Sequence, residues 1–172
     1  MQLQTFSLDR AHAAIVVGIS ETQISNWIAK NGLFAAKRLG TGKHFSFGLE
    51  DILTMASAKA LIDAGITPAV AIDICGDADI YGAWLGSKTG VLFLIKNHED
   101  RWVAADSLAA PVSLQVRMWP IFDAVYPRYC DAVREHWDEM PKDHLEGSIA
   151  ALSARIEEIR QARLGKAKTN AR

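Results

Sequence analysis

The chain contains 172 residues, of which 49% are hydrophobic and 23% are charged, proportions typical of a globular protein with a packed core. Its two cysteines, Cys75 and Cys130, are too few for the disulfide framework of a small secreted protein. No apolar run approaches the roughly 18 residues that a membrane span needs, and the first residues lack the apolar segment of a secretory leader. We therefore expect a cytoplasmic protein with no membrane contact.

The net charge of -1 conceals two basic ends. Residues 1–47 carry five basic and two acidic side chains, whereas residues 131–146 are rich in Asp and Glu. The C-terminal segment from Arg155 is basic again. Because a local basic patch is enough to hold a phosphate backbone, the near-neutral total leaves nucleic-acid binding open.

The first helix is expected over residues 8–17, with Ser7 as its N-cap and Gly18 at its end. Ser20 then caps a second helix over residues 21–30. Residues 33–47 contain two strand-like pieces around a Gly-Thr-Gly tip, a pattern that indicates a small β-wing.

Two more helices are expected after this wing. One runs over residues 49–64 and ends at Gly65. The next begins at Pro68, with Thr67 as its cap, because proline is tolerated in a first helical turn.

Strands follow in the middle of the chain, over residues 91–96, 101–106 and 112–118. The third alternates between apolar and polar positions, as in an antiparallel sheet with one wet face. Helical periodicity returns around Tyr129 and breaks at Pro141. It resumes after Asp143, which has capping-box spacing to Glu146.

The first two helices have the pattern of a helix-turn-helix. Such a unit needs a small residue where the helices cross, a glycine in the turn, and apolar anchors under the second helix. These positions are occupied by Ala14, Gly18, Ile19, Ile24 and Trp27. The outward face of the second helix then carries short polar side chains, which suit the edges of bases in the major groove.

From residue 6 to about residue 74 the chain resembles the MerR family of transcriptional regulators. The resemblance rests on Gly18-Ile19-Ser20, Gly32-Leu33, the basic wing residues Lys37-Arg38, Glu50-Asp51-Ile52, and Gly65-Ile66-Thr67. It implies a winged helix-turn-helix that binds duplex DNA. Prophage excisionases and small terminase subunits share this winged fold, so the resemblance by itself implies DNA binding rather than a particular biological role.

Two groups of residues are the expected DNA contacts. Those of the recognition helix would read bases, and those of the wing would hold phosphates. They are Ser20, Glu21, Thr22, Ser25, Asn26 and Lys30 in the first group, and Lys37, Arg38, Lys43 and His44 in the second.

The C-terminal helix carries an apolar stripe with heptad spacing. MerR-like proteins dimerise through such a helix, and a dimer would match paired half-sites. The alternative is that the stripe packs on the sheet of its own chain. Its members are Leu145, Ile149, Leu152, Ile156 and Ile159.

The expected fold class is therefore α+β, with a MerR-like winged helix-turn-helix domain over residues 1–76. A small module with about three antiparallel strands occupies residues 77–141. A dimerising helix over residues 142–165 and a flexible basic tail over residues 166–172 complete the chain.

No metal, cofactor or catalytic site is expected. Cys75 and Cys130 are far apart and are interpreted as lone buried thiols. His136 and His144 have the spacing of a solvated acidic face. The sequence contains no phosphate-cradling glycine loop, nucleophile elbow or HExxH motif, so we do not expect an enzyme.

The middle sheet could bind an unidentified effector or protein partner. Trp84, Trp102, Trp119 and Trp137 could line a pocket there, although aromatic residues at this density more often belong to the core.

The leading hypothesis is a bacterial or phage-derived, homodimeric, sequence-specific transcriptional regulator. A second hypothesis is an architectural or packaging DNA-binder of the excisionase or small-terminase type. A third is a protein-interaction adaptor with weak affinity for DNA.

Overall fold

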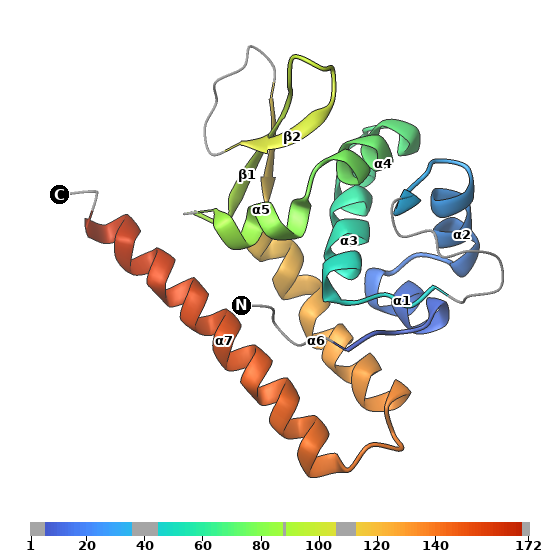
Figure 1. Cartoon of the computed structure of the whole chain (residues 1–172), viewed down its shortest axis with the longest axis vertical. Coiled ribbons are helices and arrows are strands. Elements are labelled where there is room, and N and C mark those ends of the chain that lie inside the picture. The colour runs from blue at the N-terminus through green and yellow to red at the C-terminus, as the bar shows by residue number, and fades with distance from the viewer. Residues whose placement is uncertain (1–5, 36–44, 88, 106–112, 170–172) are drawn as a thin grey trace.

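A computed structural model describes residues 6–35, 45–87, 89–105 and 113–169, with side chains up to residue 163. Within these ranges the protein consists of seven helices and one three-stranded antiparallel sheet (Figure 1). The expected α+β class is therefore confirmed.

The four N-terminal helices form close to where they are expected. They are α1 (Arg10–Val17), α2 (Glu21–Ala29), α3 (Leu49–Asp63) and α4 (Pro68–Asp77). Thr67 is the N-cap residue of α4, and Pro68 lies in its first turn, where its missing N–H costs nothing.

The start of α1 differs from the prediction. Leu8 is fully buried and forms an antiparallel bridge with Phe47, with reciprocal backbone hydrogen bonds of 2.9 and 2.8 Å. This extended pairing keeps Leu8 out of the helix. Asp9 is therefore the N-cap in place of Ser7, and its carboxylate accepts the backbone N–H of His12.

A short helix that was not predicted, α5 (Ile80–Gly86), precedes the sheet. The strands are β1 (Val91–Lys96), β2 (Trp102–Ala105) and β3 (Leu114–Arg117), in the order β2-β1-β3. The predicted alternation in the third strand is confirmed, because Val116 is buried whereas Gln115 and Arg117 are exposed.

Two long helices complete the fold, α6 (Met118–His136) and α7 (Lys142–Thr169). Met118 begins α6 and does not extend the third strand. The predicted capping box at Asp143 is wrong, because α7 already begins at Lys142. Glu146 instead accepts two hydrogen bonds, of 2.7 and 3.1 Å, from the Arg134 guanidinium on α6.

The first residues of the predicted tail, 166–169, belong to α7, which continues through Thr169; the flexibility of the tail stays a prediction. Residues 170–172 lie outside the described part of the chain.

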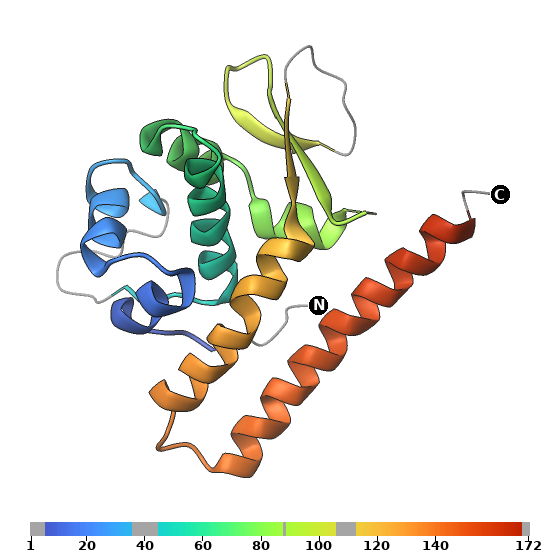
Figure 2. The same ribbon diagram turned by 180° about the vertical axis from the view of Figure 1, so that it is seen from behind.

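Helix α7 runs antiparallel to α6 along one side of the molecule (Figures 1 and 2). Ser153 on α7 is hydrogen-bonded to the Tyr126 hydroxyl at 2.8 Å, and Arg160 pairs with Asp123. The apolar stripe of α7 faces inward: Leu145, Ile149, Leu152 and Ile156 are buried, and Ile159 is half-buried. The assignment of this stripe to dimerisation is therefore corrected, because the same chain covers it.

One continuous buried cluster extends from Leu8 to Ile156. Helix α6 packs against α1 and α3. Helix α7 lies on the other side of α6, away from α1 and α3 (Figure 2). The described core consequently shows no break at residues 76 or 141. Among the described residues, no helix has both the length and the apolar character that crossing a bilayer requires.

The tryptophans contribute to packing. Trp84 is 1% exposed, and its ring centroid lies 5.0 Å from that of Trp119 and 5.1 Å from that of Phe122. Trp102, Trp119 and Trp137 are partly buried against the core. The interpretation as a core aromatic is therefore confirmed for Trp84, whereas the other three tryptophans pack against the core without being fully buried.

The buried stripe on α7 generates a stability prediction. Leu152→Ala should lower the free energy of unfolding by about 2–5 kcal/mol, because it leaves a cavity between α6 and α7. Urea denaturation measures this loss. Arg155→Ala on the exposed face of α7 is the control and should change stability by no more than about 0.5 kcal/mol.

The same experiment separates intramolecular from intermolecular packing. If the stripe packs within one chain, any dependence of the unfolding midpoint on protein concentration should be the same in the wild type and in Leu152→Ala. A midpoint that rises with concentration, and that loses this dependence in Leu152→Ala, would contradict the intramolecular assignment.

Candidate nucleic-acid interface

The turn between α1 and α2 depends on Gly18. Its φ is +75°, in the left-handed region that glycine adopts at little cost. The N–H groups of Gly18 and Ile19 both donate to the carbonyl of Ala14, at 2.9 and 3.1 Å. These bonds end α1 and turn the chain sharply into α2, as the sequence predicted.

Helix α2 begins with a complete capping box. The Ser20 hydroxyl accepts the backbone N–H of Gln23 at 3.1 Å, and the Gln23 side chain accepts the backbone N–H of Ser20 at 2.8 Å. Two N–H groups that the helix cannot pair internally are thereby satisfied. The N-terminal end of α2 is consequently well defined.

The two faces of α2 differ in character. Ile24, Trp27 and Ile28 are buried and anchor the helix on the core. Glu21, Thr22 and Lys30 are exposed, and Ser25 and Asn26 are half-buried. Helix α2 lies on the side of the molecule remote from α7 (Figure 1), so α7 does not cover its outer face.

Ser25 is held between the two helices. Its hydroxyl donates to the Glu21 carbonyl at 2.9 Å and accepts from the Arg10 guanidinium at 3.1 Å. Ser25 therefore helps to fix α2 on α1. Arg10, absent from the predicted contacts, is brought by this bond beside Ser25 on α2.

The predicted basic residues are only partly described. Lys30 is the C-cap residue of α2, at the end opposite Ser20. The wing residues Lys37, Arg38, Lys43 and His44 lie outside the described residues, as does most of the predicted β-wing. Its base is described, because Phe47 pairs with Leu8.

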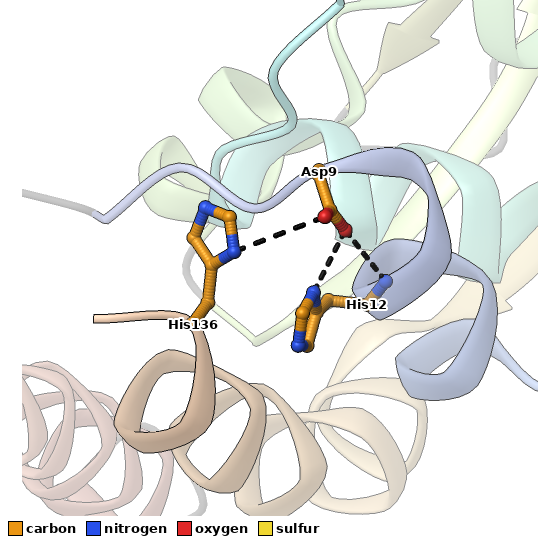
Figure 3. A group of neighbouring side chains, drawn as sticks. All are labelled: Asp9, His12 and His136. Carbon is orange, nitrogen blue, oxygen red and sulfur yellow. Dashed lines mark hydrogen bonds and ion pairs between the residues drawn. The ribbon is translucent and has the colours of Figure 1, made fainter. Parts of the chain in front are cut away.

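A second cluster joins the start of α1 to the end of α6. Asp9, His12 and His136 each offer one possible ligand atom, and these atoms lie within 4.8 Å of one another (Figure 3). The His12 Nδ1 lies 2.8 Å from Asp9 Oδ1, and the His136 Nδ1 lies 3.9 Å from Asp9 Oδ2. Partial burial raises the pKa of Asp9, but its contacts with His12 and His136 outweigh this effect and lower the pKa below its ordinary value.

Sequence reasoning missed this cluster. The i, i+3 spacing of Asp9 and His12 is visible in the sequence, but nothing there associates either residue with His136. The interpretation of His136 as part of a solvated acidic face is wrong, because it is half-buried and turned toward α1. His144 is exposed and does not belong to the cluster.

A cavity of about 430 Å³ lies between the end of α2, the start of α3 and the α4–α5 segment. Several carboxylates that line it already serve the fold: Asp51 accepts the N–H of Gly48, Asp77 accepts that of Trp102, and Asp79 caps α5. Cys75 also lines it, and burial raises the pKa of this thiol to about 12. A thiol that stays protonated at neutral pH is a poor nucleophile or metal ligand.

No model of a known protein family matches this chain, and no curated protein matches its sequence.

The capping box predicts a measurable effect on stability. Ser20→Ala should lower the free energy of unfolding by about 1 kcal/mol, because the backbone N–H of Gln23 loses its acceptor. The conservative variant Ser20→Thr keeps a hydroxyl and should retain most of this stability. Urea denaturation of the wild type and of both variants measures these differences. A Ser20→Ala variant as stable as the wild type would contradict the role of the cap.

Proposed function

We propose that this protein binds duplex DNA by placing α2 in the major groove, as a sequence-specific transcriptional regulator of MerR-like type. The observation that carries the proposal is the construction of α2. The helix is capped at its start, anchored from beneath by three buried side chains, and polar on its outer face.

The dimensions of α2 suit this role. A helix with its side chains is about 10–12 Å wide, and the major groove of B-DNA is about 12 Å wide. Thr22 and Asn26 are one helical turn apart, so both lie on the same side of α2. Their hydroxyl and amide groups can donate to and accept from base edges.

Charge supports contact with the phosphate backbone. Between residues 10 and 47 the chain has five basic residues and one acidic residue, Glu21. Arg10 and Lys30 flank the polar face of α2, and Lys37, Arg38 and Lys43 follow in the predicted wing. These side chains would supply most of the salt-dependent affinity, with His44 near them.

The proposed regulator acts as a homodimer on paired half-sites. Because α6 covers the apolar stripe of α7, such a dimer would use another surface. Sedimentation of the full chain with and without bound DNA would determine its stoichiometry.

Footprinting on genomic DNA separates this proposal from its alternatives. Protection at promoters supports a regulator, whereas protection at attachment or packaging sites supports an architectural or packaging DNA-binder. Absence of any protection at low salt would overturn DNA binding and favour a protein-interaction adaptor.

Asn26 provides a test of base reading. Asn26→Ala should reduce the preference for the selected site over random DNA, by about 1–3 kcal/mol if the amide makes a bidentate base contact. Fluorescence anisotropy with both DNAs measures this difference. Gln115→Ala, an exposed substitution on β3, is the control and should leave the preference unchanged.

The predicted wing provides a test of phosphate contact. Lys37→Ala combined with Arg38→Ala should weaken binding to all DNA sequences alike and reduce the slope of log affinity against log salt by about two. Titrations at several salt concentrations give this slope. The matched control removes two positive charges from α7, with Lys142→Ala and Arg155→Ala, and an equal loss of slope there would show that the effect is one of net charge.

A further inference from the structure

The cluster of Asp9, His12 and His136 joins two parts of the chain that are far apart in sequence. Asp9 and His12 lie at the start of α1, and His136 is the last residue of α6. The Asp9 carboxylate faces both histidines, at 2.8 Å from His12 Nδ1 and 3.9 Å from His136 Nδ1 (Figure 3). The ring centroids are 4.9 Å apart, at an interplanar angle of 62°.

From this arrangement we infer that Asp9, His12 and His136 form a binding site for a divalent transition-metal ion such as Zn²⁺. The inference does not depend on the proposed DNA binding.

The backbone that carries Asp9 is fixed to α6 by contacts that do not involve the cluster itself. The Tyr129 hydroxyl donates to the Phe6 carbonyl at 2.6 Å, and the Trp137 indole N–H donates to the Ser7 carbonyl at 3.0 Å. The rings of Phe6 and Trp137 also pack edge to face, with centroids 5.9 Å apart. The two sides of the site are thus positioned before any ion binds, which reduces the cost of binding.

The distances leave room for an ion. Neighbouring ligand atoms in a tetrahedral zinc site are about 3.3 Å apart, given metal–ligand bonds of about 2.0–2.1 Å. The three candidate atoms lie within 4.8 Å of one another, so small side-chain rotations would bring them to this spacing. The gap of 3.9 Å between His136 and Asp9 is too long for a direct hydrogen bond.

The donor set selects the class of ion. Two imidazoles and one carboxylate suit zinc and the neighbouring first-row divalent metals, whereas Mg²⁺ and Ca²⁺ prefer oxygen ligands. Three protein ligands leave at least one coordination position for water. The carboxylate side chain of Asp9 is 51% exposed, so solvent reaches the site.

The N-terminal cap of α1 is compatible with this role. The backbone N–H of His12 donates to Asp9 Oδ1, whereas Asp9 Oδ2 is the oxygen nearer to His136. The carboxylate can therefore cap the helix with one oxygen and bind an ion with the other. A bound ion would tie the beginning of the helix-turn-helix to the end of α6.

The test titrates Zn²⁺ into the full chain, purified without a histidine tag and stripped with a chelator, by isothermal calorimetry. We expect one Zn²⁺ per chain. His136→Ala should weaken binding by at least about 100-fold, since loss of a direct ligand exceeds the 10–100-fold cost of losing an outer partner. Asp9→Asn should also weaken binding while it retains the helix cap, because asparagine is a good N-cap residue.

Two controls and a second readout accompany this titration. His98→Ala and His144→Ala remove exposed histidines outside the cluster and should leave the affinity unchanged. Co²⁺ used as a probe should give visible absorption bands in the wild type but not in His136→Ala. Zn²⁺ should raise the Tm of the wild type and not that of His136→Ala.

The inference is overturned if millimolar Zn²⁺ does not bind to the wild-type chain. It is also overturned if both Asp9→Asn and His136→Ala, folded as judged by circular dichroism, bind Zn²⁺ as the wild type does. If His144→Ala or His98→Ala loses binding instead, the ion binds at the exposed surface, and the inference is again overturned.

Discussion

The structure depends on the burial of α6. This helix packs against α1 and α3 in the N-terminal half of the chain, and its buried residues include Phe122, Tyr129 and Val133. Because α6 continues directly from β3, it also connects the sheet to those helices. The free energy of burying this apolar surface therefore stabilises α1, α3 and the sheet together.

The same packing determines the role of α7. On its own, α7 has an apolar stripe that could associate with any complementary helix. The side of α6 that faces away from α1 and α3 provides such a partner, and ion pairs at both ends of the contact fix the relative position of the two helices. Arg134 and Glu146 form one pair, and Asp123 and Arg160 form the other. A surface that could serve dimerisation is consequently used to complete the core.

Both functional proposals follow from this arrangement. The core supports α2 through its buried residues, and Glu21 and Thr22 on another face of the helix are exposed. At the opposite end of α1, Tyr129 and Trp137 hold the N-terminal segment against α6 and bring Asp9 and His12 to His136. Helix α1, the first helix of the proposed DNA-binding unit, thus has one end at α2 and the other at the proposed metal site.

The amino-acid sequence by itself determined the features that arise from neighbouring residues. The cap at Ser20, the turn at Gly18, the proline start of α4 and the alternation in β3 all depend on contacts within a few positions, and each was predicted. The class of the fold and the buried face of α2 followed from the same local periodicity. Only the tertiary structure decided that Leu8 pairs with Phe47, that α7 packs on α6, and that His136 meets Asp9. These contacts join residues from distant parts of the chain, and a single sequence carries no periodicity or spacing that reports which distant surfaces will pack together.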